Sequence, residues 1–127
     1  MNKIAIVIPA YNEDKNLIKL IKEIRKKTKS IIVIVDDSKN LKTKKIINSN
    51  KIKNLYYFHR EKKLGRGSAV LFGFRKLLKK NKNLNCFIEM DADMSHSPKE
   101  LLRNISFFYN NFLDLLIGSR YLKDSEI

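Results

Sequence analysis

The chain has 127 residues, of which 43% are hydrophobic and 31% are charged, with 4 Gly and 2 Pro. This length and composition predict one globular domain and exclude a disordered or fibrous chain. The 27 Lys and Arg residues outnumber the 13 Asp and Glu residues, so the formal net charge is +14. A basic surface favours an anionic partner such as a phosphate, nucleic acid or acidic lipid, but a solvated basic surface is an equally good interpretation.

Cys86 is the only cysteine, so no internal disulfide can form, and a reducing, cytoplasmic setting is expected. The first apolar run, residues 4–9, is too short for a signal peptide or a membrane span. If the protein works at a membrane, we expect it to act at the cytoplasmic face, as a peripheral or partner-anchored protein.

Short apolar runs rich in β-branched residues alternate with helical patterns along the whole chain. The runs predict strands at 3–8, 30–37, 54–59, 85–90 and 113–121. Strands that alternate with helices predict an α/β fold, with a mostly parallel sheet and helices on both faces, in a single domain over residues 1–127.

The helix starts also have recognisable signals. Asn12, Glu13 and Asp14 precede the first helix, and Thr43 is predicted to cap the second. The third helix is expected to bury Val70, Leu71, Phe74, Leu77 and Leu78. For the last helix, Ser97 is predicted at the N-cap, with Pro98 at the first helical position and Glu100 at the third.

A polar cluster follows each predicted strand. The clusters are "YNED", "DD", "HREKKLGRG", "DAD" and "GSRY", in chain order. In open parallel sheets, ligands bind beyond the carboxyl ends of the strands, so these clusters are expected to converge on one site.

Asp91 and Asp93 are separated by one residue, so both carboxylates can face one point if the chain is extended there. Two carboxylates suit Mg²⁺ or Mn²⁺, which take further ligands from water and substrate phosphates. For an isolated Asp-x-Asp pair, solvated loop carboxylates would be the better interpretation.

One of Asp36 and Asp37 could accept hydrogen bonds from a nucleobase or ribose, or the pair could simply form a turn after the strand. Gly65 and Gly67 precede a predicted helix, where the backbone must turn tightly or approach a ligand. Cations that could pair with a diphosphate occur nearby in the sequence and after the last strand: Arg60, Lys62, Lys63, Arg66 and Arg120.

Five segments occur in a recognisable order: "VIPAYNE" (7–13), "VDD" (35–37), "REKKLGRGSAVLFGF" (60–74), "MDADMSHSP" (90–98) and "IGSRY" (117–121). With them the chain resembles the family 2 glycosyltransferases of GT-A fold, and most of all those that use dolichol or polyprenol phosphate. The resemblance covers nearly the whole chain.

The resemblance implies a nucleotide-sugar site. Asp91 and Asp93 would bind Mg²⁺ or Mn²⁺, Asp93 and Arg120 would be catalytic, and Arg120 would contact a phosphate. The remaining residues would border the donor: Pro9, Tyr11, Glu13, Asp36, Asp37, Lys63, Gly65, Arg66, Gly67, Ser68 and Ala92.

The implied reaction transfers a hexose, with inversion, from a nucleotide sugar of the GDP-mannose or UDP-glucose type to a polyprenyl or dolichyl phosphate, as in cell-envelope glycan synthesis. The sequence departs from the family after "VDD", where it reads "SKNLKT", and at Ser95, where many relatives have Gln. The family pattern also continues beyond "GSRY", so the chain is expected to be an incomplete, donor-binding part. A non-catalytic remnant, a basic binding module and a transferase with a polysaccharide acceptor stay as alternatives.

Overall fold

The computed structural model describes residues 3–13, 15–62, 64–92 and 98–117. Strands and helices alternate along them. In chain order the elements are β1 (Ile4–Ala10), α1 (Lys15–Lys27), β2 (Ile31–Asp36), α2 (Lys42–Asn50), β3 (Leu55–His59), α3 (Arg66–Lys80), β4 (Cys86–Glu89), the 3₁₀ turn η1 (Pro98–Glu100) and α4 (Leu101–Asn110).

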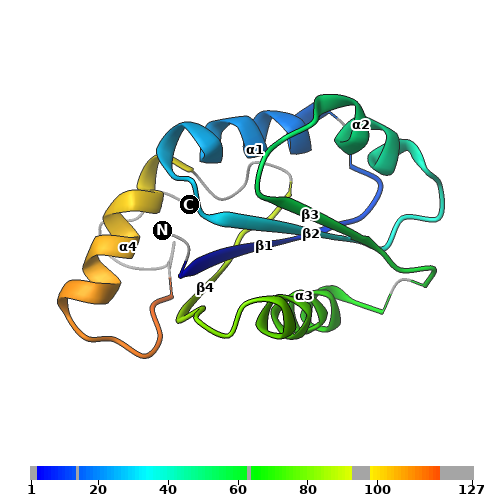
Figure 1. Ribbon diagram of the computed structural model, residues 1–127. Helices are drawn as coiled ribbons and strands as arrows, with labels where there is room; N and C mark the ends of the chain where they lie inside the picture. Colours follow the sequence, from blue (N-terminus) through cyan, green and yellow to red (C-terminus); the bar gives the residue numbers. More distant parts are fainter. Residues whose placement is uncertain (1–2, 14, 63, 93–97, 118–127) are drawn as a thin grey trace.

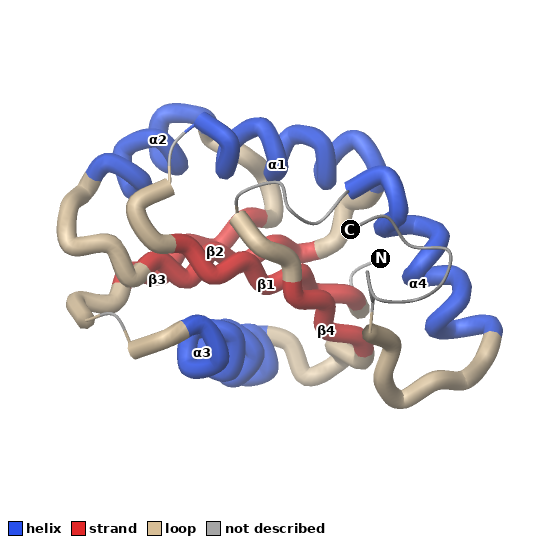
Figure 2. The backbone as a smooth tube through the Cα atoms, turned by 180° about the vertical axis from the view of Figure 1, so that it is seen from behind, coloured by secondary structure: helices blue, strands red, loops and turns tan. Residues whose placement is uncertain are grey.

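The described strands form one parallel sheet in the order β3-β2-β1-β4. Helices cover both faces: α1, α2 and α4 lie on one side, and α3 lies alone on the other (Figure 1). The view from behind in Figure 2 shows the same three layers. The predicted α/β class is therefore confirmed. Because β2 and β4 lie on opposite sides of β1, the strand order reverses there, and this is where such sheets bind ligands.

Alternating side chains on the central strands build two separate cores. On β1, Ile4, Ile6 and Ile8 join the core under α1, while Ala5 and Val7 join the core under α3. β2 divides in the same way: Ile32 and Ile34 join the core under α1, and Val33 and Val35 join the core under α3. Burial on both faces explains why these strands read as continuous apolar runs in the sequence.

Strand β1 continues two residues beyond the predicted end, through Pro9 to Ala10. Pro9 has no N–H to donate, but no hydrogen bond of the sheet is lost. An N–H at this position would point toward β4, but the pairing of β1 with β4 ends at Val7 and Glu89, so β4 offers it no partner. Thus β1 can extend its carboxyl end beyond that of β4.

The predicted cap of α2 is wrong. Thr43 lies inside the helix, is buried, and donates its hydroxyl to the Glu13 carbonyl at 3.2 Å. The Asn40 side chain accepts the Lys42 N–H at 3.0 Å instead. Thr43 therefore ties α2 to the loop after β1.

The predicted buried face of α3 is partly wrong. Leu71 and Leu78 are exposed, while Ala69, Val70, Gly73 and Leu77 are buried. This helix meets the sheet with small residues, which an apolar periodicity does not single out.

Two more expectations concern the C-terminal part. Residues 113–117 of the predicted fifth strand are not in a strand, and the remainder of it lies outside the described residues, as does Ser97. In the described part of the chain, no helix is long and apolar enough to cross a membrane.

Candidate functional site

Backbone hydrogen bonds continue the ladder of the sheet past the ends of its strands. The N–H groups of Asp37, Arg60 and Met90 donate to the carbonyls of Ala10, Asp36 and Val7, at 3.0, 2.8 and 3.1 Å. These bonds align the loops after β1, β2, β3 and β4 at one edge of the sheet. The convergence that the polar clusters predict is therefore present for the first four strands.

A cavity of about 260 Å³ opens at this edge. Its walls come from the carboxyl ends of β1, β2 and β4 and from the first turn of α3. The residues that line it are Pro9, Ala10, Tyr11, Glu13, Asp37, Gly65, Arg66, Ala69, Asp91 and Ala92. The cavity lies where the strand order reverses.

Gly65 gives this wall its shape. It has φ +93°, in the region that favours glycine, and it stands directly before the first residue of α3. The prediction of a tight turn is confirmed for Gly65. Gly67 instead lies within α3, where an added Cβ would meet no atom within 4 Å.

Asp37 and Arg60 form a two-pronged ion pair on the β2 side of the cavity. Arg60 donates from Nε and Nη2 to the two carboxylate oxygens of Asp37, both at 2.6 Å. The Arg60 side chain is only 10% exposed and the Asp37 side chain only 6%. The hydrogen bonds to Asp37 raise the pKa of the Arg60 guanidinium. Arg60 is thus engaged in holding Asp37, and its Nη1 also donates to Ser68 Oγ at 2.9 Å.

Asp36, the neighbour of Asp37, turns its carboxylate inward and is fully buried. It accepts the backbone N–H and the hydroxyl of Ser38, at 3.0 and 2.5 Å, and the hydroxyl of Tyr57. Burial, together with the bond to Asp36, raises the pKa of Tyr57. The contacts of Asp36 are therefore those of an internal brace between β2 and β3.

Arg66 forms a second ion-pair group on the β4 side. Its Nε donates to Glu89 Oε1 at 2.5 Å, and its Nη1 forms an ion pair with Asp91 Oδ1. The side chains are partly exposed, at 47% for Arg66, 39% for Glu89 and 25% for Asp91. One guanidinium thus lies between two carboxylates at the mouth of the cavity.

The structure brings together most of the residues predicted from the sequence. Asp36, Gly67 and Ser68 do not line the cavity, and Lys63, Asp93 and Arg120 lie outside the described residues. Ala10 and Ala69 also line the cavity and were not predicted, because an alanine side chain has no reactive group; Ala92 was predicted only through the family motif that contains it. The ion pair of Glu89 with Arg66 joins two elements that are distant in the sequence, so no local pattern predicts it.

A metal is implied by the family resemblance, and the described side chains allow a partial test of fit. Asp91 supplies a carboxylate at the cavity, and that carboxylate already binds a cation, the Arg66 guanidinium. The residues described do not include a cluster of three or more acidic, His or Cys side chains, and Asp93 is not among them. The donor chemistry fits a hard divalent cation.

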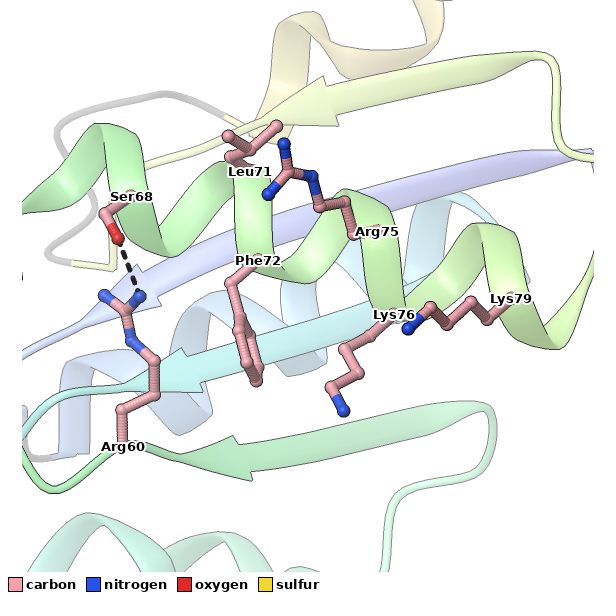
Figure 3. Close-up of a pocket in the computed structure, with 7 residues that line it drawn as sticks. All are labelled: Arg60, Ser68, Leu71, Phe72, Arg75, Lys76 and Lys79. Carbon is pink, nitrogen blue, oxygen red and sulfur yellow. Dashed lines mark hydrogen bonds between the residues drawn. The ribbon is translucent and has the colours of Figure 1, made fainter.

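A second cavity, of about 290 Å³, lies on the outer side of α3 (Figure 3). Arg60 reaches it from the end of β3, and the other lining residues come from α3: Ser68, Leu71, Phe72, Arg75, Lys76 and Lys79. The Lys76 ammonium lies 5.4 Å from the ring centre of Phe72. The lining of this second cavity includes no acid, so it is positive overall.

Comparison with known proteins relates this geometry to a family. The family described as Glycosyl transferase family 2 matches residues 5–127. The chain is 32% identical to a dolichol-phosphate mannosyltransferase of Pyrococcus furiosus, over 98% of this chain and 35% of the relative. It is 33% identical to a polyprenol monophosphomannose synthase of Mycolicibacterium smegmatis, over 92% of this chain and 44% of the relative.

A third relative, an undecaprenyl-phosphate mannosyltransferase of Micrococcus luteus, is 31% identical over 93% of this chain and 48% of its own length. The chain therefore spans between about a third and a half of the length of these three relatives. The match over residues 5–127, together with a parallel sheet whose loops meet in one polar cavity, shows that the chain belongs to glycosyltransferase family 2.

Proposed function

We propose that the cavity at the carboxyl ends of the strands binds a nucleotide sugar for transfer of its hexose to a polyprenyl or dolichyl phosphate. The observation that carries this proposal is the meeting of Tyr11, Asp37, Arg66 and Asp91 in one cavity at the switch point of the sheet. The relatives named as mannosyltransferases support mannose as the sugar.

The described side chains suggest a division of the cavity. Tyr11 is 37% exposed and offers a ring to a base or ribose at the end of β1. Asp37 offers carboxylate oxygens to a nucleoside, in an orientation that Arg60 fixes. Arg66 and Asp91 occupy the opposite side, where an arginine and a carboxylate with a bound cation would meet a diphosphate.

In the transfer we propose, an oxygen of the acceptor phosphate forms a bond to the anomeric carbon from the face opposite the leaving group. The bond from that carbon to the nucleoside diphosphate breaks, and the electron pair leaves with the diphosphate. Asp91, together with Asp93, would hold Mg²⁺ or Mn²⁺, which supplies charge stabilisation for the leaving diphosphate. An acceptor phosphate is already ionised near neutral pH, so the site requires no general base for it.

Binding is the sharper test, because the chain spans less than half the length of these named relatives. Isothermal titration with GDP-mannose and UDP-glucose, each with Mn²⁺ and with EDTA, should give metal-dependent binding of at least one donor. The double variant Asp91→Ala, Asp93→Ala should lose this binding while its circular dichroism stays unchanged.

Glu100→Ala is the matched control, because Glu100 is an exposed acid that does not line the cavity. This control should bind the donor as the unaltered chain does. Absence of binding to every sugar nucleotide tested would contradict the proposal, and donor binding retained in the double variant would remove the metal role.

A second candidate function is a basic module that binds acidic lipid. The second cavity favours it, because Arg75, Lys76 and Lys79 gather there around the apolar side chains of Leu71 and Phe72. This function predicts binding to anionic vesicles that falls steeply with salt and does not depend on divalent metal. Metal-dependent binding of a nucleotide sugar would not follow from it.

A further inference from the structure

Arg66 places one positive charge between two carboxylates from a different element. Arg66 is the first residue of α3, Glu89 is the last residue of β4, and Asp91 follows two residues later. Glu89 and Asp91 share one guanidinium, which neutralises the repulsion between them. The planar fork of an arginine suits this arrangement because it can donate in two directions at once.

This ion-pair group coincides with the position proposed for a divalent cation. Asp91 and Arg66 both line the cavity, and Asp91 Oδ1, an oxygen that could bind a metal, is the atom that pairs with Arg66. A guanidinium and a divalent cation cannot both occupy the same side of one carboxylate oxygen, because like charges repel at contact distance.

We propose that Arg66 is a built-in counter-cation that holds Glu89 and Asp91 when no metal is bound, and that it must leave Asp91 before this carboxylate can bind a divalent cation. The inference rests on the proposed donor site and adds a control of metal affinity to it. Arg66 lies within the cavity, so the displaced guanidinium remains next to the space where the donor phosphates would lie.

The proposal predicts that loss of the Arg66 charge strengthens metal binding in the absence of nucleotide. The test is isothermal titration of Mn²⁺, at one ionic strength, into the unaltered chain and into Arg66→Gln. Release of one competing, partly exposed ion pair should tighten the binding by about three- to fivefold. Arg66→Lys keeps the charge but loses the two-way fork, and should give an intermediate affinity.

Arg75→Gln is the charge-matched control. Arg75 lies on the same helix and is exposed, but it lines the second cavity. Arg75→Gln lowers the net charge by the same amount as Arg66→Gln, but at a position away from Asp91. It should therefore change the Mn²⁺ affinity by less than about twofold. The double variant Arg66→Gln, Asp91→Asn should lose the tightened binding, which would locate it at Asp91.

Equal Mn²⁺ affinity in Arg66→Gln and Arg75→Gln would overturn the inference, and so would tightened binding that persists without the Asp91 carboxylate. Failure of every variant to bind Mn²⁺ would overturn it as well. Titration of the sugar nucleotides with Mn²⁺ present decides separately whether the donor site exists: metal-dependent donor binding, with equal Mn²⁺ affinity in Arg66→Gln and Arg75→Gln, would overturn the role of Arg66 and leave the donor site standing.

Discussion

At the scale of single residues, the two adjacent aspartates after β2 have different surroundings. Asp37 faces the cavity and is fixed by Arg60, while Asp36 points into the protein and is fixed by Ser38 and Tyr57. Successive side chains of an extended chain point to opposite faces, so one carboxylate of an Asp-Asp pair turns inward when the other faces the ligand side. The inward carboxylate holds the chain after β2 through Ser38 and ties β2 to β3 through Tyr57.

Asp37→Asn should destabilise the fold as well as weaken donor binding. It leaves the Arg60 side chain, only 10% exposed, without a charged partner, and loss of one partner from a buried ion pair should cost about 2–4 kcal/mol of unfolding free energy. Urea denaturation measures this change. Glu23→Gln, which alters the exposed pair with Lys26, is the control and should change stability little. Equal effects of the two variants would contradict the structural role of the Asp37 pair.

Tyr57 should make the fold sensitive to alkaline pH. Its pKa in the folded chain is raised above the ordinary 10.0, so the unfolded chain releases this proton at lower pH than the folded one. The contribution of protonated Tyr57 to the free energy of unfolding is complete below pH 10 and is lost as the pH rises above 10. Tyr57→Phe should lower stability at pH 7 because Asp36 loses a donor, and should reduce the decline in stability above pH 10. Urea denaturation at several pH values measures this; an unfolding free energy that falls above pH 10 as steeply in Tyr57→Phe as in the unaltered chain would contradict this expectation.

At the scale of elements, the close approach of α3 to the sheet depends on a glycine. An added Cβ at Gly73 would lie 2.8 Å from Val7 Cγ1 and 3.2 Å from Val35 Cγ2. The buried side chains on this face of β1 and β2 are valines and one alanine, which are smaller than the isoleucines buried on the other face; Ile31 lies only at its edge. Small residues on both surfaces bring α3 near the sheet, and its first turn then reaches the cavity.

Gly73→Ala should therefore destabilise the protein although alanine favours helices. Overpacking costs about 1–3 kcal/mol and exceeds a propensity gain of about 1 kcal/mol, as thermal or urea denaturation can measure. Gly67→Ala, in the same helix, meets no atom within 4 Å and should be neutral or slightly stabilising. A Gly73 variant as stable as the Gly67 variant would show that α3 does not pack as the structure describes.

Element boundaries show where sequence patterns succeed and where they fail. The strands of the described region were predicted within two residues, because each is a short apolar run rich in β-branched or aromatic residues; only β1 and β2 are buried on both faces. The cap of α2 and the buried face of α3 were not, because Thr43 and Gly73 owe their positions to contacts with other elements. A local pattern contains no information about such contacts.

At the scale of the whole molecule, the basic residues behind the net charge of +14 have different surroundings. Arg60 and Arg66 are engaged with acids near the donor cavity, whereas Arg75, Lys76 and Lys79 gather around the second cavity. Only the latter group is placed to add a salt-sensitive attraction to an acidic surface.

Replacing Arg75, Lys76 and Lys79 by Gln should weaken binding to anionic vesicles at low salt by about tenfold and lower the salt dependence of that binding. Lys15, Lys19 and Lys22 on α1 provide an equal change of charge on the opposite side of the sheet. Vesicle co-sedimentation at several salt concentrations compares the two triple variants. Equal losses would show that total charge, and not the face of α3, governs this attraction.

The sequence by itself determined the class of fold, the edge of the sheet at which the polar residues gather, and the family, because apolar periodicity and ordered motifs are properties of the chain. Only the tertiary structure decided which carboxylates face the cavity and which cations they bind. Arg60 pairs with Asp37, and Arg66 with Glu89 and Asp91, across 23 to 25 residues of sequence. Such pairs depend on strand register and on the approach of α3, which residue spacing does not encode.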